Sequence, residues 1–140
     1  MYKAIDLAKY IVTKCVNDKC PISNLQLQKI LYYIQREFLR NNSYAFSESI
    51  EAWQFGPVVP EVYYKFCGSG SLPIMMKLQP IDIAPKDKDL IDKIVTEKRQ
   101  LDPWTLVEDT HKDGGAWATV YKNGLGVREV IPVELIKSVG

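Results

Sequence analysis

The stretch ISNLQLQKILYYIQREFLRNNSYAFSESIEAWQFGPVVPEVYYKF, residues Ile22–Phe66, decides the fold. Ser23 stands three residues before Gln26 and just ahead of an apolar run at helical spacing, which is the signature of a capping box at a helix start. The apolar residues that share one face of this helix are Leu27, Ile30, Leu31, Ile34 and Phe38. The pattern predicts a helix over Asn24–Arg40, at the centre of the molecule.

The same helix carries a second apolar stripe about 140° around its axis, formed by Leu25, Tyr32 and Leu39. Gln28 and Gln35 fall between the two stripes, so we expect both amides to be buried. A buried amide needs hydrogen-bond partners, and we expect main-chain groups to supply them, for at least one glutamine within Trp53–Val59. Direct contact with a partner protein is the alternative. The charged residues on the remaining side, expected to face water, are Lys29, Arg36 and Glu37.

The chain that follows this helix is predicted to be extended and then helical again. Residues 41–43 (Asn-Asn-Ser) should end the helix, and Ile50–Phe55 is typical of a short strand. Gly56 and Pro57 are predicted to end the strand in a turn. A proline then suits the first turn of a short helix over Pro60–Phe66.

Apolar periodicity, capping residues and first-turn prolines predict further helices on both sides of this stretch. They are Lys3–Asn17, a helix capped by Asp87 or Asp89, one begun by Asp102 and Pro103, one or two turns within Ala116–Lys122, and Val130–Ser138 with Pro132 in its first turn. Gly68–Ser71 should break the chain, and Leu72–Ala84 is predicted to be loop with at most one short strand. The predicted fold class is mainly α, α+β at most: one compact helical domain, residues 1–140, around a central buried helix with a small strand element.

Composition excludes several classes of protein. The 140 residues are 46% hydrophobic and 25% charged, as in globular proteins, and the net charge of +1 makes nucleic acid an unlikely partner. No start resembling a signal peptide and no apolar run of about 20 residues is present, so we expect no membrane association. The three cysteines are an odd number without CxxC spacing, which favours free thiols and a cytoplasmic location.

Two motifs carry a family resemblance. LQLQKILYYIQ (Leu25–Gln35) and IEAWQFGPVVPEVY (Ile50–Tyr63), in this order, resemble the Panacea domain. This family, also described as GepA-like or SocA-like, contains phage-associated proteins and antitoxins of bacterial toxin–antitoxin systems. The later segment THKDGGAW (Thr110–Trp117) is more loosely similar to the family's C-terminal His…Trp region.

The resemblance implies an antitoxin that neutralises its cognate toxin through direct protein–protein interaction, with no enzymatic activity and no cofactor. A phage-associated adaptor that presents a host protein to a protease is the first alternative. The positions that match the family motifs, with a structural or partner-binding role implied for each, are Gln28, Lys29, Tyr32, Gln35, Trp53, Gly56, Pro57, Val58, Pro60, Tyr63, His111 and Trp117.

His111 is the single histidine, and an enzyme that uses it with Cys67 is the second alternative. Asp109 and Asp113 are nearby in sequence, but no local catalytic signature accompanies them and no cluster has metal-ligand spacing. We therefore expect no catalytic residue and no metal site. A hydrogen bond near Trp117 at a helix end is the expected use of the imidazole.

The aromatic residues around the strand are the remaining candidates for a partner-binding surface. Trp53 is expected to be a core residue, because it belongs to an apolar strand followed by a turn. Tyr63 and Tyr64 are adjacent on a helix and about 100° apart, so at least one should reach solvent. Exposed tyrosines are enriched in recognition surfaces.

Overall fold

The computed structural model describes residues 1–79 and 81–140, and in these residues the chain is mainly helical, as predicted. The α-helices are α1 (Ala4–Asn17), α2 (Asn24–Arg40), α3 (Pro60–Phe66), α4 (Pro85–Lys98), α5 (Pro103–Thr110), α6 (Ala116–Tyr121) and α7 (Val133–Val139). Two short strands, β1 (Glu51–Trp53) and β2 (Gly56–Val58), form one antiparallel hairpin. Two 3-10 turns, Cys67–Ser69 and Lys122–Gly124, follow α3 and α6.

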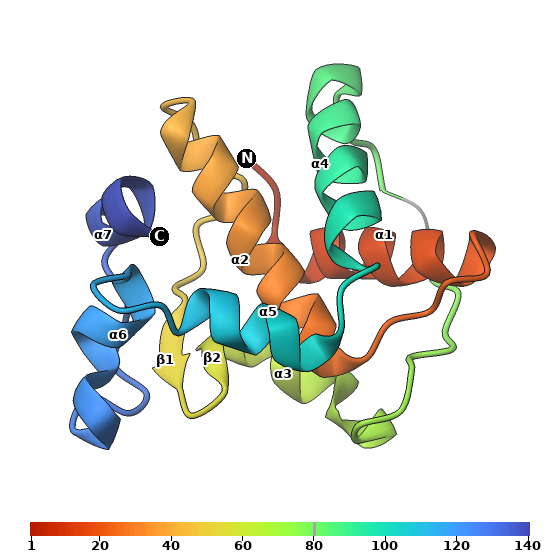
Figure 1. Cartoon of the computed structure of the whole chain (residues 1–140). Helices are drawn as coiled ribbons and strands as arrows, with labels where there is room; N and C mark the ends of the chain where they lie inside the picture. Colours follow the sequence, from red (N-terminus) through yellow and green to blue (C-terminus); the bar gives the residue numbers. More distant parts are fainter. Residues whose placement is uncertain (80) are drawn as a thin grey trace.

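The helix α2 is the central element, as the sequence predicted. It contacts α1, α3, α4, α5 and α7 as well as β2. Figure 1 shows it crossing the middle of the molecule, with α1 and α4 on one side and α6 and α7 on the other. The hairpin and α3 lie together at one edge of this view.

Local signals set both ends of α2. The Ser23 hydroxyl accepts from the Gln26 amide, and the Gln26 side chain accepts from the Ser23 N–H in return, so the predicted capping box is confirmed. At the other end Asn41 caps the helix, and Asn42 adopts a left-handed conformation with φ of 58°. Asparagine tolerates this conformation better than most residues do, so the predicted stop is confirmed as well.

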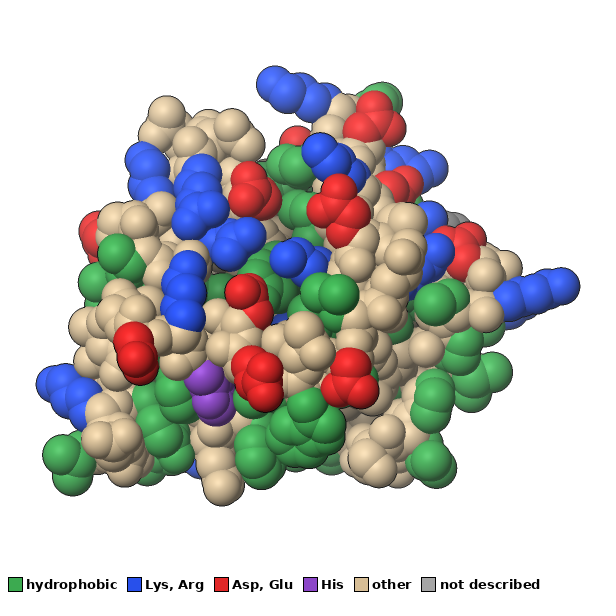
Figure 2. Space-filling model, in the orientation of Figure 1, with side chains coloured by type: hydrophobic (Ala, Val, Ile, Leu, Met, Phe, Trp, Pro, Cys, Tyr) green, Lys and Arg blue, Asp and Glu red, His purple; other side chains and the backbone are tan. Residues whose placement is uncertain are grey.

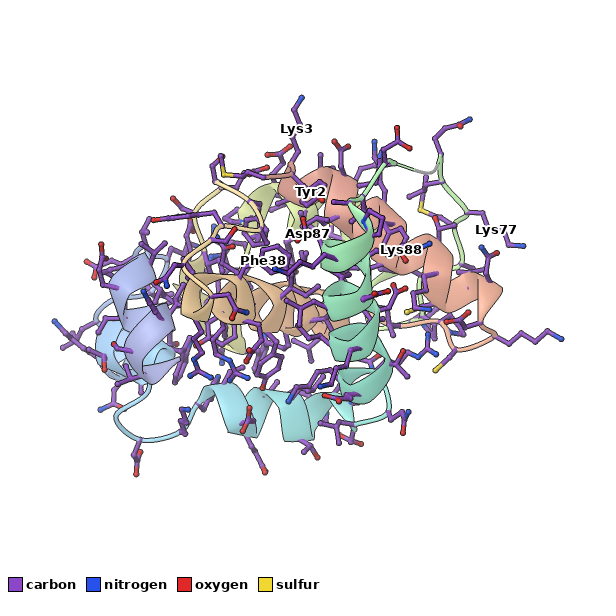
Figure 3. All side chains as sticks on the ribbon, turned by 90° about the horizontal axis from the view of Figure 1, so that it is seen from above. Tyr2, Lys3, Phe38, Lys77, Asp87 and Lys88 are labelled. Atoms are coloured by element: carbon purple, nitrogen blue, oxygen red, sulfur yellow. The ribbon has the colours of Figure 1, made fainter. Side chains whose placement is uncertain are left out.

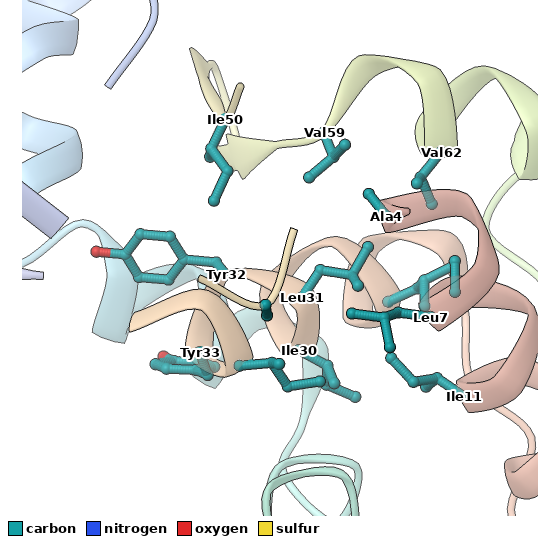
Figure 4. Close-up of a cluster of buried hydrophobic side chains, with 14 of the residues drawn as sticks. Ala4, Leu7, Ile11, Ile30, Leu31, Tyr32, Tyr33, Ile50, Val59 and Val62 are labelled. Atoms are coloured by element: carbon teal, nitrogen blue, oxygen red, sulfur yellow. The ribbon is translucent and has the colours of Figure 1, made fainter. Parts of the chain in front are cut away.

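The hydrophobic core is built on both flanks of α2. Figure 4 shows Ile30 and Leu31 of α2 facing Leu7 and Ile11 of α1, with Val59 packed from the other side. All five side chains are at most 1% exposed. Burial of a large aliphatic side chain contributes about 1.5–3 kcal/mol, so packing on both flanks stabilises α2 as the central helix.

The predicted short strand is in fact the first strand of a hairpin. Glu51 pairs with Val58 and Trp53 with Gly56, leaving Gln54 and Phe55 as a two-residue turn. The prediction that Gly56 and Pro57 form the turn was therefore wrong, because both belong to β2. Gly56 has φ of 117°, a conformation that side-chain-bearing residues rarely adopt, and this lets β2 leave the turn.

Two helix starts also differ from the prediction. The helix α4 begins at Pro85 with Ala84 as its N-cap, not at a capping aspartate. The Asp87 carboxylate accepts a 2.8 Å hydrogen bond from the Tyr2 hydroxyl, and Figure 3 shows the two side chains together. The helix α7 begins after Pro132, which is its N-cap and lies outside the first turn.

The connection before α4 has no strand in residues 72–79 and 81–84, and residue 80 lies outside the described residues. Ile74 anchors this connection, because it is 1% exposed and its N–H donates to the Ile22 carbonyl. The predicted N-cap at Asp102 is confirmed, since its carboxylate accepts from the Trp104 amide. Within the described residues, no helix combines the length and hydrophobicity needed to cross a bilayer.

Gln35 fixes the segment that enters the hairpin. It is 2% exposed, its Nε2 donates to the Phe46 carbonyl at 2.7 Å, and its Oε1 accepts from the Ala45 N–H at 2.9 Å. The prediction that this amide is buried and bonded to main chain is confirmed. One side chain on α2 thus supplies both a donor and an acceptor to a segment outside any helix or strand.

Substitution Gln35→Leu should lower the free energy of unfolding by about 2–4 kcal/mol, because it leaves buried main-chain groups at residues 45 and 46 without partners. Urea denaturation at pH 7 measures this. The matched control is Gln100→Leu at an exposed position, which should change stability by no more than about 0.5 kcal/mol. Equal effects of the two substitutions would contradict the role assigned to Gln35.

Candidate functional site

The first half of α2 meets the β1–β2 hairpin and α3 through three buried polar side chains, those of Asn24, Gln28 and Lys29. Gln28 is 1% exposed, and its Oε1 accepts from the Val59 N–H at 3.0 Å. Its Nε2 donates to Asn24, which in turn donates to the Tyr63 carbonyl at 3.1 Å. The expectation that Gln28 is buried and bonded within Trp53–Val59 is confirmed.

Lys29 is buried, which corrects the prediction that it faces water. Its side chain is 0% exposed, and its Nζ donates to the Pro57 carbonyl at 3.1 Å. The other two residues placed on that side, Arg36 and Glu37, are half-buried. An idealised helical wheel places Lys29 on the outer side, but the hairpin and α5 cover that side of α2.

The fit between Lys29 and Gly56 explains how a lysine enters the interior here. A Cβ on Gly56 would lie 2.7 Å from Lys29 Cε and 2.9 Å from both Lys29 Nζ and the Thr110 hydroxyl. The absence of a side chain at Gly56 therefore makes room for the end of the lysine. Burial lowers the pKa of Lys29 to about 7, because removal from water disfavours the ammonium form.

His111 and Trp117 lie beside this lysine at the junction of α5 and α6. The imidazole stacks on the indole with ring centroids 3.6 Å apart and planes at 3°. Buried His111 Nε2 has no hydrogen-bond partner among the described residues, so stacking replaces the hydrogen bond that the sequence predicted. Burial, with a smaller contribution from the Lys29 charge, lowers the pKa of His111. Trp117 Nε1 donates to the Trp53 carbonyl at 2.7 Å, which ties α6 to β1.

Trp53 is half-buried, and the prediction that it belongs to the core was wrong. Its ring packs against Tyr63 and Tyr64 of α3, at centroid distances of 5.0 and 6.0 Å. The Arg128 guanidinium covers the indole at 4.3 Å and donates to the Tyr64 hydroxyl. Tyr64 is 56% exposed, which confirms that one of the two tyrosines reaches solvent.

A second aromatic pair lies at the tip of the hairpin. Phe55 in the turn is 47% exposed and Trp104 at the start of α5 is 56% exposed. Their rings pack edge to face with centroids 5.5 Å apart. We call the two groups together the aromatic surface; its members are Trp53, Phe55, Tyr63, Tyr64, Trp104 and the covering Arg128. Figure 2 shows hydrophobic side chains gathered along the lower edge of the molecule, where Figure 1 places the hairpin and α3.

The remaining motif residues support this arrangement from inside or at its margin. Tyr32 is 3% exposed and packs edge-on against Tyr33, and burial raises its pKa to about 12. Val58 is 5% exposed in β2, and half-buried Pro60 occupies the first turn of α3, as predicted. These three residues therefore serve packing and backbone geometry. The exposed aromatic side chains are the groups available for contact with a partner protein.

The residues proposed for an enzyme do not form one constellation. Exposed Cys67, directly after α3, donates to the Tyr64 carbonyl of that helix, whereas His111 stacks on Trp117. The Asp109 carboxylate accepts from the Tyr33 hydroxyl. No group of three potential metal ligands occurs among the described residues.

Trp104 and Arg128 belong to the aromatic surface although the sequence motifs did not predict them as members of a site. Both reach the aromatic surface from segments far along the chain, α5 and the connection before α7. Trp104 carried a partial signal, because it directly follows the predicted N-cap and first-turn proline and is thereby placed on the first turn of its helix. For Arg128 the sequence offers no comparable signal.

The Lys29→Met variant isolates the energetic cost of the buried amine. The folded-state pKa of about 7 lies below the ordinary 10.5, so the unfolded chain holds more protons between these values. Stability of the wild type relative to Lys29→Met should therefore rise as pH increases from 7 to 10.5, by at most about 1.4 kcal/mol per pH unit. Chemical denaturation across this range measures it.

The matched control for this pH profile is Lys88→Met, which removes an exposed amine on α4. Its unfolding free energy should follow the wild-type profile at constant offset. If the Lys29→Met and wild-type profiles also run parallel, the amine is solvated and the burial of Lys29 is refuted.

Comparison with known proteins agrees with the motif residues described above. The family described as Antitoxin SocA-like, Panacea domain, matches residues 27–118, well over half of the 140-residue chain. Antitoxin SocA of Caulobacter vibrioides (strain NA1000 / CB15N) is 31% identical over a match that covers 87% of this chain and 74% of that relative. No solved structure matches. The resemblance of the two sequence motifs is thereby confirmed, and the chain belongs to the antitoxin SocA-like Panacea family.

Proposed function

We propose that this protein neutralises a cognate toxin by binding it directly through the aromatic surface. The observation that carries the proposal is the exposure of Phe55, Tyr64 and Trp104 around one hairpin, on a chain of an antitoxin family. Neutralisation of this kind requires a surface that covers or distorts the toxin's working site. It requires no cofactor and no reaction catalysed by the antitoxin.

The chemistry of the aromatic surface suits protein recognition. Tryptophan, tyrosine and arginine are the residue types that most often dominate binding energy at protein interfaces. Arg128 over Trp53 and the edge-to-face pair of Phe55 with Trp104 present large rings already held in place. Pre-ordered rings lose less conformational entropy when a partner binds, so this surface can provide anchor residues at low cost.

The family relationship and the absence of a catalytic constellation among the described residues support a non-enzymatic role. The cognate toxin is the expected partner, in the cytoplasm, with residues 1–140 acting as one domain. An adaptor that delivers its partner to a protease would use the same surface. The two functions differ in one requirement, because an adaptor protects cells only when the protease is present.

Co-expression with the toxic protein encoded beside this gene should rescue growth, and the two proteins should co-purify in a stoichiometric complex. The variants Tyr64→Ala and Trp104→Ala should each weaken binding by about 30-fold, the effect of losing one aromatic anchor. The matched control is Tyr44→Ala, which removes a tyrosine that is 45% exposed and follows the C-terminal end of α2. This variant should bind as the wild type does.

Isothermal titration calorimetry and growth assays measure both effects. Retained rescue and affinity in Tyr64→Ala and Trp104→Ala would place the binding surface elsewhere. Rescue that disappears in protease-deficient cells, with the complex still formed, would replace direct neutralisation by the adaptor function.

The variants His111→Ala and Cys67→Ser should rescue growth as well as the wild type does, provided that their circular dichroism shows a folded protein. Neither proton transfer nor thiolate attack is required of these side chains in a binding mechanism. Loss of rescue in a folded His111→Ala protein that still binds the toxin would establish an enzymatic step instead.

A further inference from the structure

Lys29 lies in the interior without a carboxylate to balance its charge. No described Asp or Glu lies within salt-bridge distance of its Nζ, and the Pro57 carbonyl is its hydrogen-bond acceptor. A buried charge of this kind is costly unless it is paired. Methionine would fill nearly the same volume without that cost, so packing alone does not account for a lysine here.

The bond that Lys29 makes cannot be made by an apolar side chain. Strand β2 pairs with β1 on one edge, and its other edge faces α2. There Lys29 donates to the Pro57 carbonyl and Gln28 accepts from the N–H of Val59, the residue after β2, so two consecutive residues of α2 bond the free edge of β2 and its continuation. Without the lysine the buried Pro57 carbonyl would lose its partner, and the strand would have to shift to find another.

The bonded strand directly follows the turn that carries Phe55. Gly56 and Pro57 are buried against Lys29, whereas Phe55 is exposed and packs on Trp104. The position of Pro57 therefore determines how far the Phe55 ring extends toward α5. Lys29 itself has no exposed atom with which to contact a partner.

We propose that Lys29 is a positioning residue for partner recognition: through the Pro57 carbonyl it holds the hairpin turn so that Phe55 and Trp104 form one binding surface. This inference rests on the proposed function for its partner, and on the structure of the free protein for its geometry. It assigns to Lys29 an effect on affinity that is separate from its effect on stability.

The first arm of the test uses the free protein. In ¹H–¹⁵N spectra at pH 7, Lys29→Met should shift the Phe55 and Gly56 amides and the Trp104 indole N–H, while its melting temperature stays at or above the wild-type value. The control Gln35→Met removes a buried polar side chain that bonds residues 45 and 46. It should lower the melting temperature and leave the Phe55 and Trp104 signals in place.

The second arm measures affinity for the co-purifying toxic protein by calorimetry. Lys29→Met should bind about tenfold more weakly or worse, whereas folded Gln35→Met should bind as the wild type does. Wild-type affinity in Lys29→Met, or unshifted Phe55, Gly56 and Trp104 signals, would overturn the inference. If the wild-type protein does not bind the protein encoded by the neighbouring gene, the proposed function fails. The spectra of the free protein then decide whether Lys29 positions the hairpin turn.

Should Lys29→Met not fold, Lys29→Gln replaces it in both arms. Its amide keeps a donor but is one bond shorter, so the Phe55, Gly56 and Trp104 signals should shift in the same direction and the affinity should fall. A folded Lys29→Gln protein with wild-type spectra and affinity would equally overturn the inference.

Discussion

Hydrogen bonds from buried side chains of α2 to the main chain of neighbouring segments are the interactions on which the rest of the structure depends. Residues 41–59 contain only six strand residues, yet much of this segment passes over a buried helix. Its N–H and C=O groups cannot reach water there, and the main chain of α2 is already bonded within the helix. Side chains must therefore supply the hydrogen-bond partners of these main-chain groups. Amide side chains suit this role because each has both a donor and an acceptor. Gln35 uses both groups on the segment before β1, and seven residues earlier Gln28 accepts from the Val59 N–H after β2 while its amide nitrogen donates to Asn24.

The parts of the fold that local chemistry controls could be predicted from the sequence. The central helix, its capping box and the two buried glutamines follow from spacing along a single helix, which tertiary contacts did not override. The starts of α4 and α7 were misplaced, because Pro85 and Pro132 competed with neighbouring residues as start signals. The second strand was missed because Gly-Pro is typical of turns. In β2 the missing N–H of Pro57 costs little, because its pairing partner Ala52 directs its own N–H and carbonyl to Glu129 and Arg128 instead.

The parts of the candidate site that depend on distant residues could not be predicted. Lys29 is buried because Gly56, 27 positions later, has no side chain to occupy the same space. Trp53 was expected in the core, but its ring packs on Tyr63 and Tyr64 of α3 and is covered by exposed Arg128 instead of by further core side chains. Helical spacing identifies which residues share a face. It does not identify which faces a later segment will cover, and both corrections arise from that difference.

The same polar bonds that complete the interior also determine the surface. A recognition surface placed on a turn is precise only if the turn is held by groups that cannot relax. Here Pro57 in the middle of β2 and Val59 directly after it are bonded to consecutive residues of α2, and β1 is bonded to α6 through Trp117. The buried hydrogen bonds thus determine the spacing of the exposed rings. An interior that was wholly apolar would be less costly to fold, but it would leave the hairpin carbonyls unpaired and the turn free to move.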